Sequence, residues 1–424
     1  MYEVLIHDYS TFIFNIVLIP VAIFSIIFYL VAIRDIFSMR SKKKEEKKEG
    51  KIFPFVTIQI PTLNEPVAIR CAEKCLNFDY PKNKYEIIIG DDSNNKEVSA
   101  MIDDFAKKHK NVKVTRRGSN KGFKAGNLNH MLKFSKGEII VIFDSDFTPS
   151  EKFLKEIVQP FADKSVGYVQ AKWGYANRNQ NVITKLATSI LMVYHHLLAS
   201  INQNLNVALL FGSGEAVRKS AIEELGGWKE GSLTEDVEFS IRALKKGYKA
   251  VYLSEIEVEG EVPFTVRGFA KQQRRWAYGN TKAFLDHSKA ILFSKMFSLK
   301  QRLAVMFTLL GYLVSPFIAV FFITGFMSWF TGTPGAVDVG KFAWETGKIL
   351  LISSGYMFSI IVSLRKEKQL KSFFHVFFSS LTVGIVVTFY VCVGVLKALV
   401  GKGLDWTIIP KEGNKVVGGT RCYS

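Results

Sequence analysis

Long apolar stretches near the two ends of the chain enclose a region of ordinary globular sequence. Residues 11–33 carry no charge and are long enough to cross a hydrocarbon core about 30 Å thick. No basic segment precedes them and no small-residue cleavage site follows, so they predict an uncleaved membrane anchor. Three further apolar stretches, at about 303–330, 349–364 and 373–400, predict additional spans.

Residues 55–260 instead alternate short β-rich runs with helical patterns. Strands are predicted at 56–60, 85–90, 112–115, 139–143 and 207–211, and helices at 66–77, 96–109, 123–134 and 151–162. Strands that alternate with helices favour an α/β fold with a mostly parallel sheet covered on both faces. Ligands of such sheets bind beyond the carboxyl ends of the strands. Polar motifs that directly follow strands are therefore the candidates for a functional site.

The chain of 424 residues carries a net charge of +18. Its 48% of hydrophobic residues and its four Cys exclude a disordered chain and a disulfide-framed domain. On a soluble protein the positive excess would suggest nucleic acid. Most of the excess lies beside the apolar stretches, at 34–51, 264–302 and 365–371. The positive-inside rule predicts that these segments and the central region are cytoplasmic and that the N-terminus lies outside the cell membrane. Because this topology and the attraction to anionic lipid account for the positive charge, we expect no nucleic acid as partner.

Acidic and polar residues follow four of the predicted strands. Residues 61–65 (PTLNE), 91–93 (DDS) and 212–214 (GSG) each come directly after one. Asp144 and Asp146 follow a five-residue apolar run, and two carboxylates at a buried sheet edge repel one another unless a cation joins them. Hard oxygen ligands suit Mg²⁺ or Mn²⁺, which usually complete their shell with substrate phosphates. This pair therefore suggests a nucleotide diphosphate, whereas the acids at 91–93 could equally cap a helix.

Two further motifs allow both a structural and a catalytic interpretation. Thr234, Glu235 and Asp236 open a predicted amphipathic helix at 235–246, so Thr234 can cap this helix and the acids can favour its first turn. Alternatively, a carboxylate of this motif deprotonates an acceptor hydroxyl. Residues 272–276 (QQRRW) are typical of an interfacial helix with an anchoring Trp, but Arg can also bind a pyrophosphate and Trp can lie under a sugar ring.

Taken together, these motifs resemble those of the inverting, membrane-embedded family 2 glycosyltransferases, which include cellulose, chitin and hyaluronan synthases. The shared order is D at 92, D-x-D at 144–146, T-E-D at 234–236 and Q-Q-x-R-W at 272–276. Supporting strings are IPTLNE at 60–65, GFKAGNL at 122–128, FDSDFTP at 143–149, VQAKW at 169–173, GGW at 226–228, EVP at 261–263 and WTIIPKEG at 406–413. The chain looks most like the cellulose-synthase-like A branch, the glucomannan and mannan synthases.

The resemblance implies a GT-A domain, that is, a Rossmann-like mixed sheet with helices, and a metal-dependent transfer from a nucleotide-diphosphate sugar. It implies that the donor is bound by Pro61, Thr62, Glu65, Asp92, Lys124, Asp144 and Arg275. Asp144 and Asp146 would hold the metal, Mg²⁺ or Mn²⁺. A UDP-sugar is the favoured donor, with GDP-mannose as the alternative.

On the acceptor side, the resemblance implies that Asp236 is the general base, within a catalytic motif that includes Thr234 and Glu235. The acceptor would be bordered by Trp276, Gln273, Gly212 and Ser213, with the Trp under its sugar ring. Residues 211–214 read F-G-S-G where the branch usually shows F-N-G-T, which leaves the identity of the acceptor open.

The spans and the resemblance together predict five parts. They are an N-terminal transmembrane helix and basic linker (1–40), a cytoplasmic GT-A catalytic domain (41–263), amphipathic interfacial helices (264–301), a C-terminal transmembrane region (302–400) and a tail (401–424). Four full spans that begin outside would leave the tail outside, whereas the resemblance places it near the active site. Either 373–400 is re-entrant or interfacial, or another stretch also crosses.

Three functions are open from the sequence. A processive synthase of a β-linked polysaccharide is favoured by Q-Q-x-R-W and by the aromatic-rich spans. The alternative is a non-processive transferase that adds one sugar to a membrane lipid, because four apolar stretches make a polysaccharide channel cramped and the basic segment 264–302 suits a membrane-level acceptor. A non-catalytic membrane scaffold is the third, and the joint presence of all the chemistry-bearing carboxylates argues against it.

Overall fold

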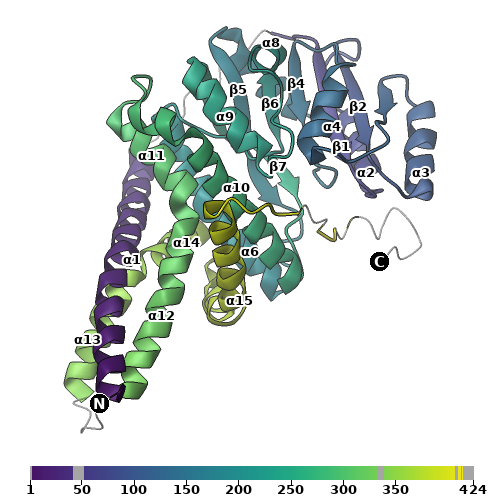
Figure 1. The fold of residues 1–424 in the computed structure, drawn as a ribbon. Helices are drawn as coiled ribbons and strands as arrows, with labels where there is room; N and C mark the ends of the chain where they lie inside the picture. The colour runs from purple at the N-terminus through teal and green to yellow at the C-terminus, as the bar shows by residue number, and fades with distance from the viewer. Residues whose placement is uncertain (1, 42–51, 333–338, 406–408, 412, 414–424) are drawn as a thin grey trace.

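The computed structural model describes residues 2–41, 52–332, 339–405, 409–411 and 413, which form two parts (Figure 1). A sheet with helices on both faces forms one end of the molecule, and a group of long helices extends away from it. The linker 42–51 and most of the tail lie outside the described residues.

The sheet has seven strands in the order β3-β2-β1-β4-β6-β5-β7. They are β1 (Val56–Thr62), β2 (Tyr85–Asp91), β3 (Val112–Thr115), β4 (Ile139–Ile142), β5 (Val166–Tyr175), β6 (Glu215–Arg218) and β7 (Lys249–Gly260). β1 to β4 pair in parallel, as do β5 and β7, whereas β6 is antiparallel to both β4 and β5. The sheet is therefore mixed, as the resemblance implies, and its first four strands lie where the sequence predicts them.

This part contains eight α-helices among the described residues. They are α2 (Ala68–Leu76), α3 (Lys96–Lys107), α4 (Phe123–Leu132), α5 (Phe153–Ile157), α6 (Val182–Val193), α7 (Ala199–Asn204), α8 (Lys219–Glu224) and α9 (Glu235–Lys246). Five of them (α2, α3, α4, α5 and α9) lie where helices are predicted. The predicted helix 151–162 divides into α5 and a 3₁₀ turn that contains Pro160, which cannot continue the hydrogen bonding of a helix. A π-helical turn, Tyr194–Leu198, joins α6 to α7.

The predicted strand at 207–211 is wrong, because the described sheet contains no pairing for this segment. Two of its backbone N–H groups donate to side chains instead. Leu210 N donates to Ser240 Oγ at 2.9 Å, and Phe211 N donates to Gln170 Oε1 at 2.8 Å. The apolar run reflects burial without strand pairing, and the strand of this region, β6, begins after the GSG motif.

Apolar side chains fill both faces of the sheet. Along β2, Ile87 and Ile89 join the core that includes α2 and α3, while Ile88 joins the core that includes α4. Successive side chains of a strand point to opposite faces, so three isoleucines in a row are typical of a strand that is buried on both sides. Helices thus cover both faces and leave the carboxyl ends of the strands for a site.

Gly90, the next residue of β2, lies so close to α4 that no side chain fits. A Cβ there would be 2.1 Å from Asn127 Oδ1 and 2.7 Å from Met131 Sδ. We expect Gly90→Ala to destabilise the protein by about 1–3 kcal/mol, the usual cost of overpacking a core, and to lower its melting temperature. Gly403→Ala is the control, since a Cβ there would meet no atom within 4 Å. An unchanged melting temperature for Gly90→Ala would contradict this packing.

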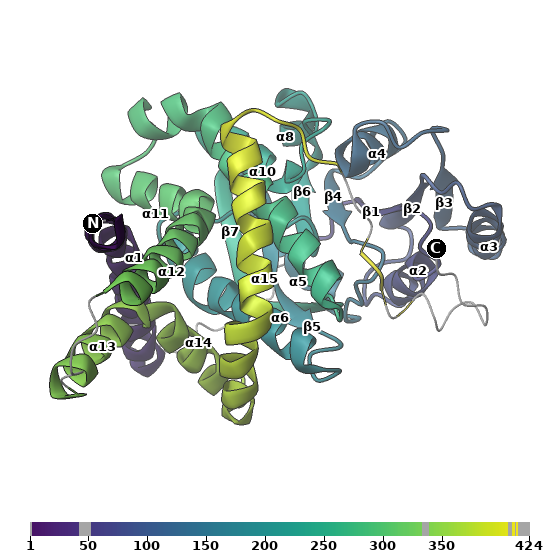
Figure 2. The same ribbon diagram turned by 60° about the horizontal axis from the view of Figure 1, so that its bottom comes forward.

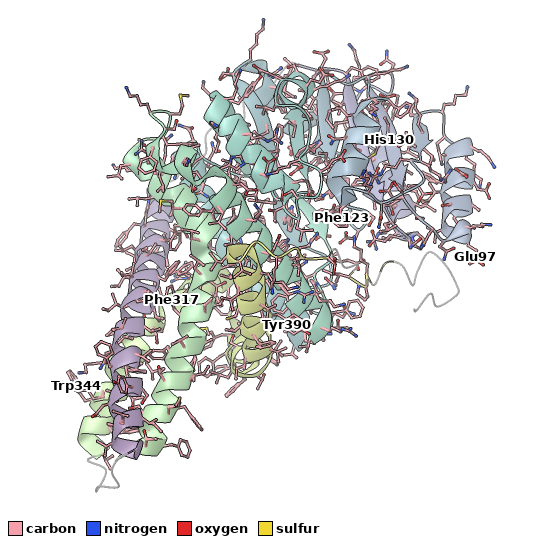
Figure 3. The ribbon with its side chains drawn as sticks, viewed as in Figure 1. Glu97, Phe123, His130, Phe317, Trp344 and Tyr390 are labelled. Atoms are coloured by element: carbon pink, nitrogen blue, oxygen red, sulfur yellow. The ribbon has the colours of Figure 1, made fainter. Side chains whose placement is uncertain are left out.

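The second part consists of long helices. They are α1 (Tyr2–Ser41), α10 (Val266–Phe293), α11 (Leu299–Leu310), α12 (Val314–Thr331), α13 (Val339–Ser353), α14 (Gly355–Lys366) and α15 (Phe373–Leu399). Their outer surface is apolar: Figure 3 shows Phe317 and Trp344 on this part, and the Trp344 side chain is 68% exposed. Extensive exposed apolar surface marks contact with a membrane or a partner.

By length and composition, four helical stretches among the described residues could cross a membrane. They are Val4–Phe37, Val182–Asn204, Leu299–Thr331 and Leu370–Leu399. The first and the last two match the predicted spans at 11–33, 303–330 and 373–400. The remaining prediction, 349–364, falls across α13 and α14, which are bent by 58° at their junction and are together long and apolar enough to form a broken span or a re-entrant loop. Val182–Asn204 is not predicted from the sequence as a span, and 61% of its most apolar window is buried inside the protein.

α10 lies between the sheet and α15 (Figure 2). A Cβ on Gly279 of α10 would be 2.4 Å from Thr234 Cγ2, and a Cβ on Gly394 of α15 would be 2.5 Å from Arg274 O. The lack of a side chain at both glycines allows this close approach. The fold therefore holds the QQRRW motif of α10 directly against the TED motif that opens α9.

Candidate active site

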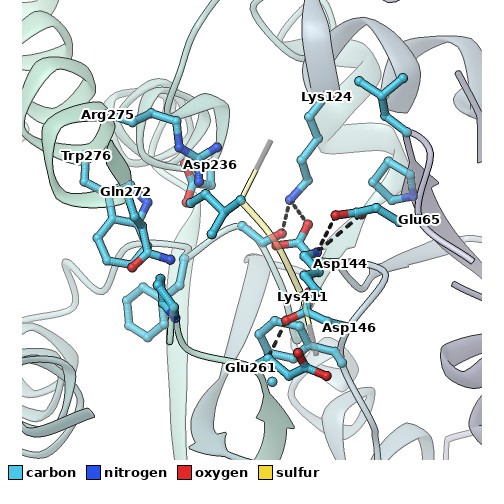
Figure 4. Close-up of a pocket in the computed structure, with 18 of the residues that line it drawn as sticks. Glu65, Lys124, Asp144, Asp146, Asp236, Glu261, Gln272, Arg275, Trp276 and Lys411 are labelled. Atoms are coloured by element: carbon cyan, nitrogen blue, oxygen red, sulfur yellow. Dashed lines mark hydrogen bonds and ion pairs between the residues drawn. The ribbon is translucent and has the colours of Figure 1, made fainter. Parts of the chain in front are cut away.

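A cavity of about 190 Å³ lies at the carboxyl ends of the central strands (Figure 4). Its lining includes most of the residues that the sequence predicts for donor, metal and base: Pro61, Thr62, Glu65, Asp92, Lys124, Asp144, Asp146, Gly212, Thr234, Glu235, Asp236, Arg275 and Trp276. These residues come from distant segments of the chain, so it is the fold that brings them together.

A second, larger cavity of about 900 Å³ lies among the long helices and meets the first. The two cavities share Trp173, Leu191, Phe211, Thr234, Asp236 and Trp276 in their linings. Gln273 lines only the larger cavity, and Ser213 lines neither. The shared residues define the junction at which a molecule in the small cavity could meet one in the large cavity.

Lys124 and Asp144 form a buried ion pair in the small cavity. Lys124 Nζ lies 2.6 Å from Asp144 Oδ1 and 3.5 Å from Glu235 Oε1. Burial lowers the pKa of Lys124, but the charges of Asp144 and Glu235 outweigh it, and the pKa lies above its ordinary value. Burial raises the pKa of Asp144, but Lys124 and then Lys411 outweigh it, and this pKa lies below its usual value. Both groups are therefore charged at neutral pH.

Asp146 is held by the C-terminal tail and by the end of β7. Lys411 Nζ lies 2.6 Å from Asp146 Oδ1 and 3.3 Å from Glu65 Oε1. Glu261 N donates to Asp146 Oδ2 at 2.9 Å, and Ser145 Oγ donates to Glu65. Burial raises the pKa of Glu65, although Lys411 opposes the shift. A segment about 265 residues away in sequence thus completes this acidic cluster.

Asp144 and Asp146 fit a divalent metal that a substrate would complete. Within the described residues, no group of three or more His, Cys, Asp and Glu side chains could hold a metal alone. One or two carboxylates together with substrate phosphates are, however, a usual environment of Mg²⁺. Since Lys411 lies 2.6 Å from Asp146, a cation at this carboxylate must replace the ammonium group. The residues therefore fit a metal that is shared with a diphosphate.

Asp236 lies in the first turn of α9, at the junction of the two cavities. Burial and then the charge of Glu235 raise the pKa of Asp236 to about 7, although Lys124 and Arg275 oppose the shift. A carboxylate with such a pKa can accept a proton near neutral pH. Thr234 is the N-cap residue of α9 by position, but its hydroxyl makes no capping hydrogen bond. Capping alone therefore does not explain this motif.

The GSG turn shapes the site next to Asp236. Gly212 has a φ of +86°, and a Cβ there would be 3.2 Å from Asp236 Oδ2 and 3.4 Å from Lys124 Nζ. A side chain at this position would be strained and would crowd both groups. Ser213 is fully buried, and its Oγ accepts a hydrogen bond from Asp144 N at 2.9 Å. Gly212 thus lines the cavity, whereas Ser213 holds Asp144 from behind.

Asp92 lies at the end of the cavity formed by β1 and β2. Arg117 Nε donates to Asp92 Oδ1 at 2.9 Å, and Arg117 Nη2 donates to Asp92 Oδ2 at 2.6 Å. Such a bidentate pair fixes the orientation of the carboxylate. Asp92 N also donates to Thr62 O at 3.0 Å, and Thr62 Oγ1 donates to Glu65 O at 3.2 Å. These bonds tie the two strand ends together.

α10 supplies the opposite wall, where Figure 4 shows Gln272, Arg275 and Trp276 beside Asp236 and across from Lys124. Burial lowers the pKa of Arg275, although Glu235 and Asp144 oppose the shift. Two cationic side chains therefore stand on either side of the small cavity, as an anionic ligand would require.

The residues of the site that the sequence predictions miss include Lys411, Arg117 and Trp173. Trp173 donates from Nε1 to Ser213 O at 2.8 Å and lines both cavities. It is the last residue of the VQAKW string, and this string could have identified Trp173 as a site residue. Lys411 belongs to the WTIIPKEG string, of which 406–408 and 412 lie outside the described residues. Arg117 has no signal beyond its place after β3.

A mixed seven-stranded sheet with an Asp-x-Asp pair at the open ends of its strands defines a GT-A-like domain. Residues 139–344 match the family described as glycosyl transferase family group 2. This part of the chain is therefore similar to the glycosyltransferases of family 2, and the resemblance noted in the sequence is confirmed.

Similar proteins include two from rice (Oryza sativa subsp. japonica). The chain is 32% identical over 289 residues to a "Probable glucomannan 4-beta-mannosyltransferase 7", an alignment that covers 65% of this chain and 49% of that protein. It is 28% identical over 378 residues to "Glucomannan 4-beta-mannosyltransferase 1", covering 85% of this chain and 70% of that protein. The chain thus spans about half the length of the first of these relatives.

Among solved structures, the fold is similar to that of the mannosyltransferase PcManGT from Pyrobaculum calidifontis, in complex with GDP-Man and Mn²⁺. The TM-score is 0.64 at 19% sequence identity, and the superposition covers 93% of this chain and 99% of that one. At this identity the likeness concerns the fold.

Proposed function

We propose that this protein is a membrane-bound inverting glycosyltransferase that moves a sugar from a nucleotide-diphosphate sugar to a growing β-linked polysaccharide. The observation that carries the proposal is the placement of Asp236 at the junction of the two cavities, with Lys124 and Arg275 lining the small one. One cavity then binds the donor and the other admits the acceptor. The names of the two rice relatives support a polysaccharide product.

The reaction follows from these positions. An acceptor hydroxyl attacks the anomeric carbon, a new C–O bond forms, and the bond from this carbon to the diphosphate oxygen breaks. Asp236 takes the hydroxyl proton as it is released. Lys124 and Arg275 stabilise the charge that develops on the leaving diphosphate. One displacement inverts the anomeric centre, so an α-linked donor gives a β-linkage. Glu235 and Thr234 support Asp236, and Trp276 lies under the acceptor sugar.

For the donor, we propose GDP-mannose in place of the UDP-sugar that the sequence favours. Both rice relatives are named as mannosyltransferases, and the similar solved structure holds GDP-Man. Asp92, fixed by Arg117, is available to the nucleoside together with Pro61 and Thr62. Asp144 and Asp146 would hold Mn²⁺ or Mg²⁺, which when bound supplies Lewis-acid stabilisation of the diphosphate. Gln273 and Gly212 complete the acceptor side.

For the topology, we propose that the N-terminus is outside and that the sheet domain, about 41–263, is cytoplasmic. Lys411 contacts Asp146, so the tail shares the side of the sheet domain. α15 runs alongside α10, as Figures 1 and 2 show, and it also contacts α12. We therefore favour α15 as an interfacial helix, because a full crossing would leave the tail on the wrong side.

Incubation of the protein in nanodiscs with radiolabelled nucleotide sugars tests this function. With GDP-mannose and Mn²⁺ we expect labelled, high-mass product that a β-mannanase degrades, with at least tenfold less incorporation from UDP-glucose. Faster incorporation from the UDP-sugar would refute the donor proposal. Absence of both transfer and nucleotide release with every donor would refute the glycosyltransferase activity itself.

A further inference from the structure

The large cavity has two chemically different ends. At the junction with the small cavity its lining includes Asp236 and Trp276, together with Gln273 and His195. Away from this junction it is lined by side chains of α1, α12, α14 and α15: Phe24, Phe28, Ile318, Phe322, Tyr356, Met357, Ile360, Ile385 and Phe389. A ligand that fits this cavity is therefore polar at one end and apolar at the other.

The polar end offers unused hydrogen-bonding groups. His195 and Gln273 are each only 3% exposed, and both line the cavity. His195 Nδ1 and Gln273 Nε2 have no hydrogen-bond partner among the described residues. Buried polar atoms without partners are costly, so these two indicate a place where a ligand group completes the bonding.

The apolar end offers few such groups, although several of its lining residues are serines. Ser353 Oγ donates to Ile349 O at 2.8 Å, and Ser380 Oγ donates to Val376 O at 2.7 Å, each within its own helix. Ser25 Oγ accepts from a backbone N–H of α14 at 2.7 Å. These hydroxyls are occupied, so the many hydroxyls of a sugar chain would lose their hydrogen bonds to water without replacement.

The aromatic rings at this end are also engaged with one another. The ring centroids of Phe24 and Phe28 lie 5.4 and 5.3 Å from the ring centroid of Phe307, and the ring centroid of Phe28 lies 4.8 Å from that of Tyr356. They form a packed apolar wall, whereas a sugar channel requires free ring faces on which sugars can stack. The aromatic-rich helices therefore do not by themselves indicate a polysaccharide channel.

The cavity also reaches the outer, lipid-like surface of the helices. Phe322 and Ile323 of α12 and Ile385 and Phe389 of α15 line the cavity, yet their side chains are 59–68% exposed on the outside. A cavity with such a rim can be entered sideways from a bilayer without passage through water.

We propose that the large cavity binds the aliphatic chain of a membrane lipid whose head group presents the acceptor hydroxyl to Asp236, so that the first product is a β-glycolipid on which a longer chain can grow. The inference rests on the proposed glycosyl transfer and names the class of its first acceptor. His195 and Gln273 bind the polar head group, and the residues of α1, α12, α14 and α15 surround the chain.

Alkyl β-mannosides that differ only in chain length, from methyl to dodecyl, are suitable probes for the protein in nanodiscs. We expect kcat/KM to rise by about two- to fourfold for each methylene that enters the cavity, since burial of a methylene contributes about 0.8 kcal/mol. Unmodified mannooligosaccharides should be poor first acceptors. In short incubations with membrane lipid, label should first appear in the organic phase and only later in high-mass material.

Two glycines allow the cavity to be filled without disturbing the fold. Gly311 and Gly384 line it, and a Cβ at Gly311 would meet no atom within 4 Å, while one at Gly384 would meet only ordinary contacts of 3.8 and 3.9 Å. Gly311→Phe and Gly384→Phe should abolish the dependence on chain length but leave hydrolysis of the donor to free sugar unchanged. Gly347→Phe, on the exposed face of α13, is the matched control and should behave like wild type.

The outcomes separate the two proposals. If mannooligosaccharides are elongated as efficiently as dodecyl mannoside and Gly384→Phe has no effect, the lipid inference is refuted and the transferase activity stands. If no donor is turned over, the binding of radiolabelled dodecyl β-mannoside still tests the lipid site. Binding to Gly384→Phe that is at least tenfold weaker than binding to Gly347→Phe supports the lipid site, and equal binding refutes it.

Discussion

Asp236→Asn is expected to abolish transfer while donor binding stays largely intact. The amide has almost the same size as the carboxylate but cannot take the proton of the acceptor hydroxyl, and a positioned base contributes about 10²–10⁴-fold to a rate. We expect kcat to fall by this factor and the Kd for the nucleotide sugar to change less than threefold. Asp163→Asn, an exposed carboxylate of the same domain, is the control and should retain full activity.

Retention of normal transfer by Asp236→Asn would remove this residue from the role of base. The pH profile gives an independent test. Only the deprotonated carboxylate accepts a proton, and the pKa of Asp236 is raised to about 7 by burial and then by Glu235. Wild-type kcat/KM should therefore rise as the pH increases through about 7 and reach a plateau above it. A profile that is flat between pH 6 and 8 would contradict this assignment.

The same shift predicts an effect on stability that does not depend on activity. A carboxyl group whose pKa is higher in the folded than in the unfolded state destabilises the fold when it ionises, so stability is lost as the pH rises from about 4 through 7. Replacement by a neutral amide removes this cost. Asp236→Asn should therefore have a higher melting temperature than wild type at pH 8, with a smaller difference at pH 5.

The position of three acidic residues of the site could be predicted because they follow strands, whereas their roles are implied by the family resemblance. Asp92, Asp144 and Asp146 each come just after a run of buried residues, and parallel strands bring their carboxyl ends to one edge. Lys411 could not be placed in this way. It belongs to no strand or helix, and its contact with Asp146 depends on the path of α15 across α10.

The errors of the sequence predictions have local causes. Residues 207–211 are buried like a strand, but side chains such as Ser240 and Gln170 take the hydrogen bonds that a neighbouring strand would provide. The hydrophobic pattern does not predict the break at Ser354, where α13 ends and α14 begins at an angle of 58°. It also does not predict that α15 packs along α10. A sequence pattern predicts which residues are buried, but often not which part of the chain packs against them.

Asp146→Asn is expected to reduce transfer by about 10²–10³-fold, since stabilisation by a metal is worth several kcal/mol in the transition state. An amide is a much weaker ligand than a carboxylate for Mn²⁺ or Mg²⁺. Wild-type activity should be lost in EDTA and restored by Mn²⁺, whereas Asp146→Asn should require far more Mn²⁺ for its residual activity. Asp79→Asn, an exposed acid of the same domain, is the control.

Asp146 also binds Lys411, so a loss of activity in Asp146→Asn could arise from release of the tail rather than from the metal. Lys411→Met separates the two causes, because it removes the ammonium group and leaves both carboxylates. If Asp146 holds the metal, Lys411→Met should keep the wild-type Mn²⁺ requirement or need less Mn²⁺, since the lysine no longer competes for Asp146. If Lys411→Met reproduces both the loss of rate and the raised Mn²⁺ requirement, the metal assignment of Asp146 is wrong and its role is to hold the tail.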